Sequence, residues 1–481
     1  MNKKGLLALT LAMCLLLSGC LFRPPDDLYA LPKVSAGYEQ LNDVIAEVQR
    51  GLETEYGISP ESAVIVSGDN TATVQLQDLD GDGARESAVT FLRVPGVERS
   101  LKICIFSQLG EDYRLTGLVE GDGSSIYSVD YVELNGSGKK ELVVNWQLSN
   151  GVYQLGVYTL DELSPLEGEN DSLSVVLDEE KRAQLMATEL LLVSCSAVTD
   201  SSGTSSGYRL VDIDQDTSME IAVARVDSGG MGSQIEVYGW EDGAFRRTAW
   251  VELSSGISTL NQIRANYLSG ELYPPALYVT STLVDGSRVI DVLAYQDGRL
   301  VNLALRDGIS VEILQAYIDV SPSDINGDNV LELPSPRALP SQEESSSSNF
   351  WLIEWFQYDE SGERSYVMTT YHNVSDSWYL KIPESWRDQI TISRNDQVSG
   401  QREVIFSHWR GEGQEPEPFL SIYRLTGSRR STNAAQTGRF ILQEEESVIY
   451  AAKFYDSQWD CGLDQADLLD RFVTISPSWY S

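Results

Sequence analysis

An acidic turn that recurs along this 481-residue chain constrains its fold more than any other feature. The first copy runs from Asp78 to Glu86 and reads Asp-Leu-Asp-Gly-Asp-Gly-Ala-Arg-Glu. Oxygen-bearing side chains stand at positions 1, 3, 5 and 9, and the glycines allow the tight backbone turn that gathers them. Four segments share this register, and we number them loops one to four: 78–86, 133–141, 212–220 and 324–332.

The side chains of these loops suit a hard divalent cation. Ca²⁺ takes about six to eight oxygen ligands, and carboxylates crowded into one turn repel each other until a cation binds. We therefore predict bound Ca²⁺ in loops one, three and four, with a metal-free turn as the alternative. Loop two carries Ser137, Lys139 and Lys140, so hydrogen bonds are expected there instead. The predicted ligands are Asp78, Asp80, Asp82, Glu86, Asp212, Asp214, Asp216, Glu220, Asp324, Asn326, Asp328 and Glu332.

The loops differ from EF-hands in two respects. An EF-hand has a bidentate Glu at position 12 and a helix on each side, whereas the flanks here alternate like strands and position 12 holds Val89, Val144, Val223 or Ser335. A repeated strand–acidic loop–strand unit resembles the FG-GAP or VCBS-like repeats of β-propellers, over roughly residues 70 to 430. The resemblance implies that the calcium is structural and clamps each loop between blade strands. It implies no catalysis.

The spacing of the loops predicts the number of repeats. Short apolar runs separated by turns indicate four strands per unit, the pattern of a propeller blade. The gap from residue 212 to residue 324 is 112 residues, or twice 56, so a degenerate copy is expected near residue 268. One begins at Asn266, and another begins at Asn395. We predict an all-β fold, a β-propeller of six or seven four-stranded blades over residues 59–481, the seventh closed by N-terminal and C-terminal strands together.

Helices are expected at two places. Residues 35–58 predict an N-terminal helix with an apolar face that packs on the body, a role in dimerisation or partner binding being the alternative. A small helical insertion is expected at about 165–200, with its helix at 178–193. A second insertion, 335–349, is rich in serine and predicts an exposed flexible loop.

The chain begins with the features of a bacterial lipoprotein leader. Lys3 and Lys4 precede an apolar run over 5–17, which is shorter than the roughly twenty residues that a membrane-spanning helix needs. The segment Leu-Ser-Gly-Cys that ends at Cys20 is similar to a lipobox. The resemblance implies that residues 1–19 are a signal peptide, that Cys20 is lipidated, and that 20–34 form a tether. The alternative is an ordinary signal peptide with a chance cysteine.

The charge of the chain bears on its partners. Its 72 acidic and 35 basic residues give a formal net charge of −37. Such a field repels phosphate backbones, which argues against nucleic acid, and it attracts cations and basic proteins. A solvated acidic surface that keeps the protein soluble is the simpler interpretation.

Signals for catalysis are few, and we predict no catalytic residue. His372 and His408 lie in different repeats and lack the spacing of zinc ligands. Residues 203–207 match the letters of a nucleophile elbow, but they lie in a Ser/Gly-rich linker before a strand. Seven of the ten tryptophans lie beyond residue 350 and either fill the core, which we favour, or stack on sugars or proteins.

These features together predict an extracytoplasmic lipoprotein anchored to the cell membrane through its lipid. Its calcium-stabilised propeller is expected to act as a binding or assembly module for a protein or a glycan and not as an enzyme. The alternative is a polysaccharide-acting lyase or hydrolase, because similar propellers carry lyase chemistry in some families.

Overall fold

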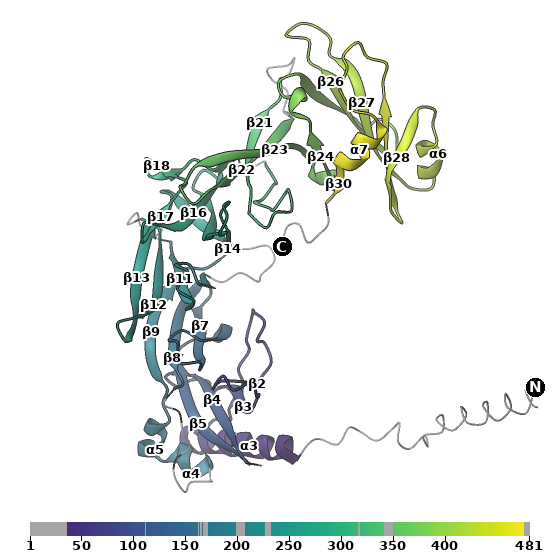
Figure 1. The fold of residues 1–481 in the computed structure, drawn as a ribbon. Coiled ribbons are helices and arrows are strands. Elements are labelled where there is room, and N and C mark those ends of the chain that lie inside the picture. The colour runs from purple at the N-terminus through teal and green to yellow at the C-terminus, as the bar shows by residue number, and fades with distance from the viewer. Residues whose placement is uncertain are drawn as a thin grey trace, which may run out of the picture.

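The computed structural model describes residues 36–110, 112–161, 163, 166, 172–198, 207–226, 232–315, 318–340 and 350–475. Most of the regular structure in these residues is antiparallel β-sheet. Six sheets of four or five strands follow one another in chain order, and we number them one to six. Figure 1 shows the sheets arranged in an open arc, with helix α3 near one end and sheet six at the other.

Sheets one to three each come from one continuous stretch of chain, and their central strands pair with sequence neighbours. The strands of sheet one are β1 (Glu61–Ser62), β2 (Val74–Gln77), β3 (Ser87–Arg93), β4 (Leu101–Leu109) and β5 (Asp112–Gly121); those of sheet two are β6 (Ser125–Val132), β7 (Glu141–Ser149), β8 (Val152–Thr159) and β9 (Thr188–Cys195); those of sheet three are β10 (Tyr208–Val211), β11 (Glu220–Arg225), β12 (Gln234–Glu241) and β13 (Ala244–Glu252).

Sheets four to six follow the same plan with additions at their edges, and β18 (Leu305–Arg306) pairs with β19 (Ile309–Ser310) as a separate ribbon. Sheet four contains β14 (Ile257–Tyr267), β15 (Pro275–Leu283), β16 (Arg288–Gln296), β17 (Arg299–Asn302) and β20 (Ile313–Leu314); sheet five contains β21 (Leu333–Ala338), β22 (Trp351–Tyr358), β23 (Arg364–Asn373), β24 (Trp378–Ile382) and β30 (Phe472–Thr474); sheet six contains β25 (Ile390–Asn395), β26 (Gln401–His408), β27 (Glu417–Thr426), β28 (Arg439–Glu444) and β29 (Val448–Phe454).

The described helices are short apart from the first. They are α3 (Ala36–Tyr56), α4 (Ser172–Leu177), α5 (Glu179–Gln184), α6 (Arg430–Ala434) and α7 (Gln465–Arg471), with 3-10 turns η2 (Val374–Asp376) and η3 (Glu384–Trp386). The predicted N-terminal helix is confirmed as α3. It ends at Gly57, whose φ of 68° and whose N–H donated to Glu53 O at 2.8 Å form a left-handed C-terminal cap.

The hydrophobic core lies between successive sheets. Neighbouring residues in a strand point to opposite faces of the sheet, so Val143 of β7 packs toward sheet three with Ile221, and Val144 packs toward sheet one with Val89. Both faces of these sheets are covered. This is why the central strands are apolar at consecutive positions and do not alternate with polar residues.

Each end of the arc is covered by a helix. Leu41 and Val48 of α3 pack against Phe106 and Leu115 of sheet one. At the other end, α6 contributes Ala434 to a small cluster on sheet six. These helices cover apolar faces at the two end sheets, in the way that capping repeats end a solenoid.

The four-stranded units are confirmed, but the described residues form an open arc and not a closed ring (Figure 1). The prediction that a C-terminal strand helps to close a seventh blade is also wrong. After β29 the chain returns through α7, and β30 adds to sheet five beside β24, pairing Phe472 with Leu380. A ring requires the two end sheets to pack on each other, and here each packs against its own helix.

Two local expectations were wrong in part. The helix predicted over 178–193 ends at Gln184, and the run from Thr188 forms β9, the fourth strand of sheet two, which pairs with β8. The predicted loop 335–349 begins as strand β21, in which Pro334 and Pro336 are tolerated because the strand lies at a sheet edge. Residues 341–349 lie outside the described residues.

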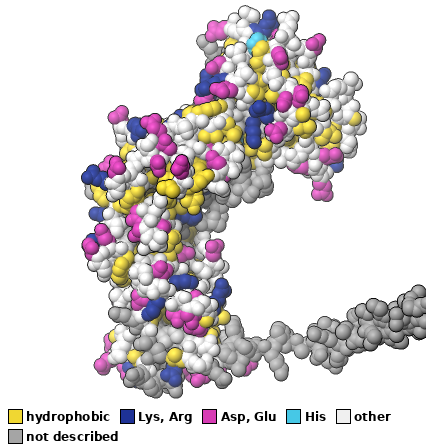
Figure 2. Space-filling model, viewed as in Figure 1, with side chains coloured by type: hydrophobic (Ala, Val, Ile, Leu, Met, Phe, Trp, Pro, Cys, Tyr) yellow, Lys and Arg dark blue, Asp and Glu magenta, His cyan; other side chains and the backbone are white. Residues whose placement is uncertain are grey.

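Other sequence predictions concern parts of the chain that are not described. The leader 1–19, Cys20, the tether 20–34 and the segment 203–207 lie outside the described residues. Within the described ranges, none of the helices has the length and apolar character needed to cross a membrane. Figure 2 shows acidic and basic side chains interspersed over the visible face, as expected for a solvated charged surface.

Candidate metal centres

Loops one to three each connect two paired strands, namely β2–β3, β6–β7 and β10–β11. Loop four precedes β21 and is closed by a backbone bridge between Ser323 and Glu332. The first carboxylate of loop one organises its turn, because Gly81 N–H donates to Asp78 Oδ1 at 2.8 Å and Gly83 N–H donates to Asp78 Oδ2 at 3.1 Å. The loops are therefore turns shaped by their own side chains, with a strand at both ends of loops one to three and a backbone bridge closing loop four.

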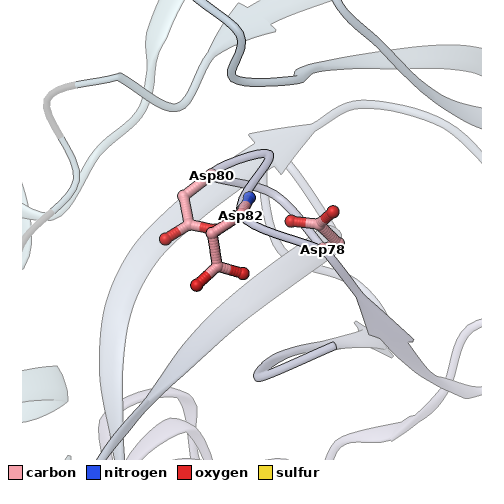
Figure 3. A group of neighbouring side chains, drawn as sticks. All are labelled: Asp78, Asp80 and Asp82. Atoms are coloured by element: carbon pink, nitrogen blue, oxygen red, sulfur yellow. Dashed lines mark hydrogen bonds between the residues drawn. The ribbon is translucent and has the colours of Figure 1, made fainter. Parts of the chain in front are cut away.

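Loop one brings three of its four predicted ligands together. Asp78, Asp80 and Asp82 offer carboxylate oxygens within 4.8 Å of one another, and Figure 3 shows all three on one turn. Glu86, at the ninth position, is not part of this group. Partial burial and the negative charges of the three aspartates raise the pKa of the Glu86 carboxyl, so the loop carries unbalanced negative charge.

Loop three also brings three carboxylates together, in a different combination. Asp212, Asp214 and Glu220 lie within 4.8 Å of one another. Glu220 is buried, and its Oε2 accepts the N–H of Ile213 at 2.9 Å. Burial raises the pKa of Glu220 to about 8, although this hydrogen bond acts in the opposite direction. Asp216 lies outside the group and accepts a backbone N–H at 2.7 Å.

Loop four brings together Asp324, Asp328 and Glu332, at positions 1, 5 and 9. The predicted ligand Asn326 instead donates from Nδ2 to Asp328 Oδ2 at 2.9 Å. Gln357 of β22 ties the loop to its sheet, since its Nε2 donates to Glu332 Oε1 at 2.6 Å and to Asp328 Oδ2 at 2.8 Å. Burial raises the pKa of Glu332 to about 7.

Loop two is joined by hydrogen bonds, as its composition indicates. Asn135 Nδ2 donates to Glu141 Oε1 at 2.7 Å and to Asp161 Oδ2 at 2.8 Å. Lys139 Nζ lies 3.8 Å from Asp161 Oδ1. A lysine ammonium thus stands near the carboxylates where a cation would otherwise be needed.

Loops three and four make their turns with few glycines. Gln215 and Thr217 have φ values of 65° and 79°, and Asn329 has a φ of 68°, in the left-handed region that Gly81 and Gly83 occupy in loop one. Asn tolerates this conformation best among non-glycine residues, whereas Gln and Thr adopt it at a cost. The loop geometry is therefore kept although the sequence signature has weakened.

The donor sets of loops one, three and four fit a hard cation such as Ca²⁺, which prefers carboxylate oxygens. In loop three, Asp212 Oδ1 is buried without a hydrogen-bond partner among the described residues. Burial raises the pKa values of Glu220 and Glu332 to about 8 and about 7, which favours protonated carboxyls near neutral pH when no cation is close. A bound cation would satisfy the buried oxygen and replace those protons, and water would complete its coordination.

Loops one and two touch each other across the boundary between sheets one and two. Lys140 N–H donates to Leu79 O at 2.9 Å. A Cβ atom placed on Gly81 would stand 2.0 Å from Gly138 O, so a side chain is not tolerated there. This contact makes the geometry of the first metal centre depend on the neighbouring sheet.

A cavity of about 680 Å³ lies between loops three and four. Asp212 and Asp324 line it, together with Tyr267 at the end of β14 and Tyr273 in the β14–β15 loop. Sequence reasoning missed these tyrosines, because they belong to a degenerate repeat that has lost its acidic loop. The only local signal is the motif Leu272-Tyr273, which places two large apolar side chains in a turn.

Three of the tryptophans and both histidines singled out in the sequence make packing contacts, and Trp479 lies outside the described residues. Trp355, Trp378 and Trp386 are buried, which confirms core packing for these three. Burial lowers the pKa of His372 to about 3, so this imidazole is neutral at pH 7. The His408 ring stacks on Trp459 with centroids 4.9 Å apart.

No family model matches this sequence, and no curated protein matches it. Among solved structures, a Bacillus licheniformis rhamnogalacturonan lyase shares 12% identity at a TM-score of 0.28, over 62% of this chain and 66% of the lyase. A periplasmic gluconolactonase from Pseudomonas aeruginosa shares 11% identity at a TM-score of 0.25, over 75% of this chain and 85% of the other. At these TM-scores neither fold nor activity is carried over to this chain.

Proposed function

We propose that this chain is a lipid-anchored binding or assembly module on the extracytoplasmic face of the cell membrane, with a protein or glycan as ligand. In this proposal the six sheets are blades of the propeller type held in series, and Ca²⁺ in loops one, three and four clamps them. The calcium stabilises the scaffold and takes no part in a reaction.

The observation that supports this function best is that a group of three carboxylates recurs in three separate loops, although the positions that supply it differ from loop to loop. Loop one connects the second and third strands of its sheet, loop three follows the first strand, and loop four precedes the first strand, so a bound cation would hold the strands near the start of each sheet. An enzyme needs only one catalytic centre, whereas a cation that stabilises the scaffold is needed in each repeat. Repetition of these carboxylates therefore favours a scaffold role.

Calcium binding is tested with the full chain by calorimetric titration and by thermal unfolding with Ca²⁺ or with EGTA. We expect Ca²⁺ to raise the melting temperature, and Asp214→Asn or Asp324→Asn each to remove one binding site. The control is Glu53→Gln, which changes an exposed carboxylate on α3 and should leave binding unchanged. A melting temperature that is the same with Ca²⁺ and with EGTA would refute the calcium clamp.

The membrane anchor rests on the leader sequence alone, since Cys20 lies outside the described residues. We expect the full-length precursor to incorporate labelled palmitate in a bacterial host and to fractionate with membranes. Cys20→Ala should abolish labelling and release the protein from the membrane fraction. Labelling of Cys20→Ala at the wild-type level would refute lipidation at this residue.

The binding role is tested by screening the calcium-loaded chain against arrayed glycans and, in pull-down experiments, against cell-surface proteins. A specific ligand that survives washing, and whose capture falls with EGTA, is the expected result. Turnover of a polysaccharide by the purified chain would instead establish the enzymatic alternative.

A further inference from the structure

We infer that the cavity between loops three and four binds neutral carbohydrate, with Tyr267 and Tyr273 as its stacking surface. The inference deepens the proposed binding role and rests on it.

The size and position of the cavity suit a ligand larger than an ion. Its volume of about 680 Å³ falls within the ~300–1,000 Å³ of typical ligand pockets. Its walls come from sheet three through Asp212 and Gln215, from sheet four through Tyr267 and Tyr273, and from loop four through Asn329. Three consecutive repeats therefore build one concave site.

Two tyrosine rings stand exposed at this cavity. Tyr267 and Tyr273 are 47% and 46% exposed, and their rings meet edge to face with centroids 6.2 Å apart. The backbone of Tyr267 is fixed, because its carbonyl accepts the Tyr278 hydroxyl at 2.9 Å and its strand bridges to Val330. Exposed aromatic rings offer an apolar face to a ligand, and the C–H face of a sugar ring is complementary to it.

The conformation of Tyr273 is unusual for a bulky residue. Its φ is 46°, in the left-handed region, where a side chain such as tyrosine is strained. Gln215 and Asn329, on the other two walls, also have positive φ. Glycine would relieve the strain at Tyr273 and Gln215, whereas Asn329 tolerates its conformation, so two strained side chains that line one cavity suggest that the side chains themselves are needed.

The polar groups of the cavity select the charge of its ligand. Asn266, Gln215 and Asn329 contribute amides, which both donate and accept hydrogen bonds and so match sugar hydroxyls. Among the described residues that line it, none is Lys or Arg, and Asp212 and Asp324 would repel an acidic sugar. Both oxygens of Asp324 already accept backbone N–H groups. Asp212 and Asp324 also belong to the carboxylate groups assigned to Ca²⁺ in the proposed function, which leaves neither free to pair with a basic ligand, so a neutral sugar fits best.

The test is binding of the full chain to neutral hexasaccharides built from glucose, galactose, mannose or N-acetylglucosamine, measured by calorimetry in Ca²⁺. Oligogalacturonate and hexa-arginine serve as acidic and basic probes. We expect at least one neutral hexasaccharide to bind and the other two classes not to bind. Tyr273→Gly removes the ring and relieves the strained φ, so the variant should fold at least as well while its affinity falls about tenfold or more.

Trp250→Ala is the matched control, because Trp250 is an aromatic residue 51% exposed on β13, a strand that contributes no residue to the cavity. It should bind like the wild type. Neutral-sugar binding that Tyr273→Gly leaves unchanged would overturn the site while preserving the proposed binding module. Binding of hexa-arginine alone would overturn the ligand class. Failure of every sugar, together with capture of a protein ligand in the broader screen, would overturn this inference and leave the proposed function intact.

Discussion

Glu332 accepts a hydrogen bond through Oε2 from the backbone N–H of Ile325, seven residues earlier, at 2.8 Å. The carboxylate at the ninth position therefore fixes the start of the turn to its end, and we call this hydrogen bond the latch. Only the second oxygen of the carboxylate remains for other partners. Two other loops repeat the latch. The equivalent pairs are Glu220 with Ile213 at 2.9 Å and Glu141 with Leu134 at 2.8 Å.

Removing the latch should destabilise the protein. Glu332→Ala leaves the buried N–H of Ile325 without its acceptor, which costs about 1–3 kcal/mol, and it removes one of the two acceptors of Gln357 Nε2, the other being Asp328 Oδ2. We expect a loss of this order in the free energy of unfolding, measured by urea denaturation in EGTA. The control is Glu86→Ala, because Glu86 is only partly buried. Equal losses in the two variants would contradict the latch.

The contact between loops one and two predicts a difference between two similar glycines. Gly81 and Gly83 both have positive φ, but an added Cβ meets Gly138 O at 2.0 Å only at Gly81 and meets nothing within 4 Å at Gly83. Gly83→Ala should cost about 1 kcal/mol from backbone strain. Gly81→Ala should cost about 3 kcal/mol, because the loops must also separate. Calorimetric unfolding of both variants checks this, and equal costs would show that the loops part freely.

Stability should depend on pH through Glu141. Burial raises the pKa of this carboxyl to about 7, from an ordinary value of 4.5. Because the folded state holds the proton more tightly, the stabilisation is complete below pH 4.5 and is lost as the pH rises through 7. Glu141→Gln cannot ionise but can still accept the Leu134 N–H, so its melting temperature should fall less over this range. The measurement is thermal unfolding of both proteins in EGTA, and parallel curves would rule out this role for Glu141.

Helix α3, which covers sheet one, should be essential for the stability of that end of the arc. Leu41 of α3 is 1% exposed within the cluster that contains Phe106. Leu41→Ala should lower the free energy of unfolding by about 2–5 kcal/mol through lost burial and an unfilled cavity. It should also raise the proportion of oligomers in size-exclusion chromatography, because loosening the helix exposes an apolar sheet face. Glu53→Ala, on the exposed side of the same helix, should change neither quantity.

Much of the fold followed from local chemistry. Alternate carboxylates and left-handed positions act within nine residues, so the turns at Asp78, Asp212 and Asp324 could be identified without knowing their neighbours. The repeat spacing located sheet four from Asn266 and sheet six from Asn395, because each unit needs the same four strands to cover its apolar faces. The helix over Ala36–Tyr56 was readable from its apolar stripe for the same local reason.

The remaining features depend on contacts between residues far apart in the chain. The run Thr188–Cys195 suits either a helix or a strand, and pairing with β8 makes it a strand. A closed ring and an open arc need the same blades, and the choice follows from the helices that cover the end sheets. Tyr267 and Tyr273 line one cavity with Asp212 and Asp324 only because loops from three repeats converge there. The sequence by itself determined the repeating unit and its acidic turns, because these rest on short-range sterics and patterning. Only the tertiary structure decided how many units join, where they stop and what their edges enclose, because those outcomes depend on surfaces that sequence neighbours do not share.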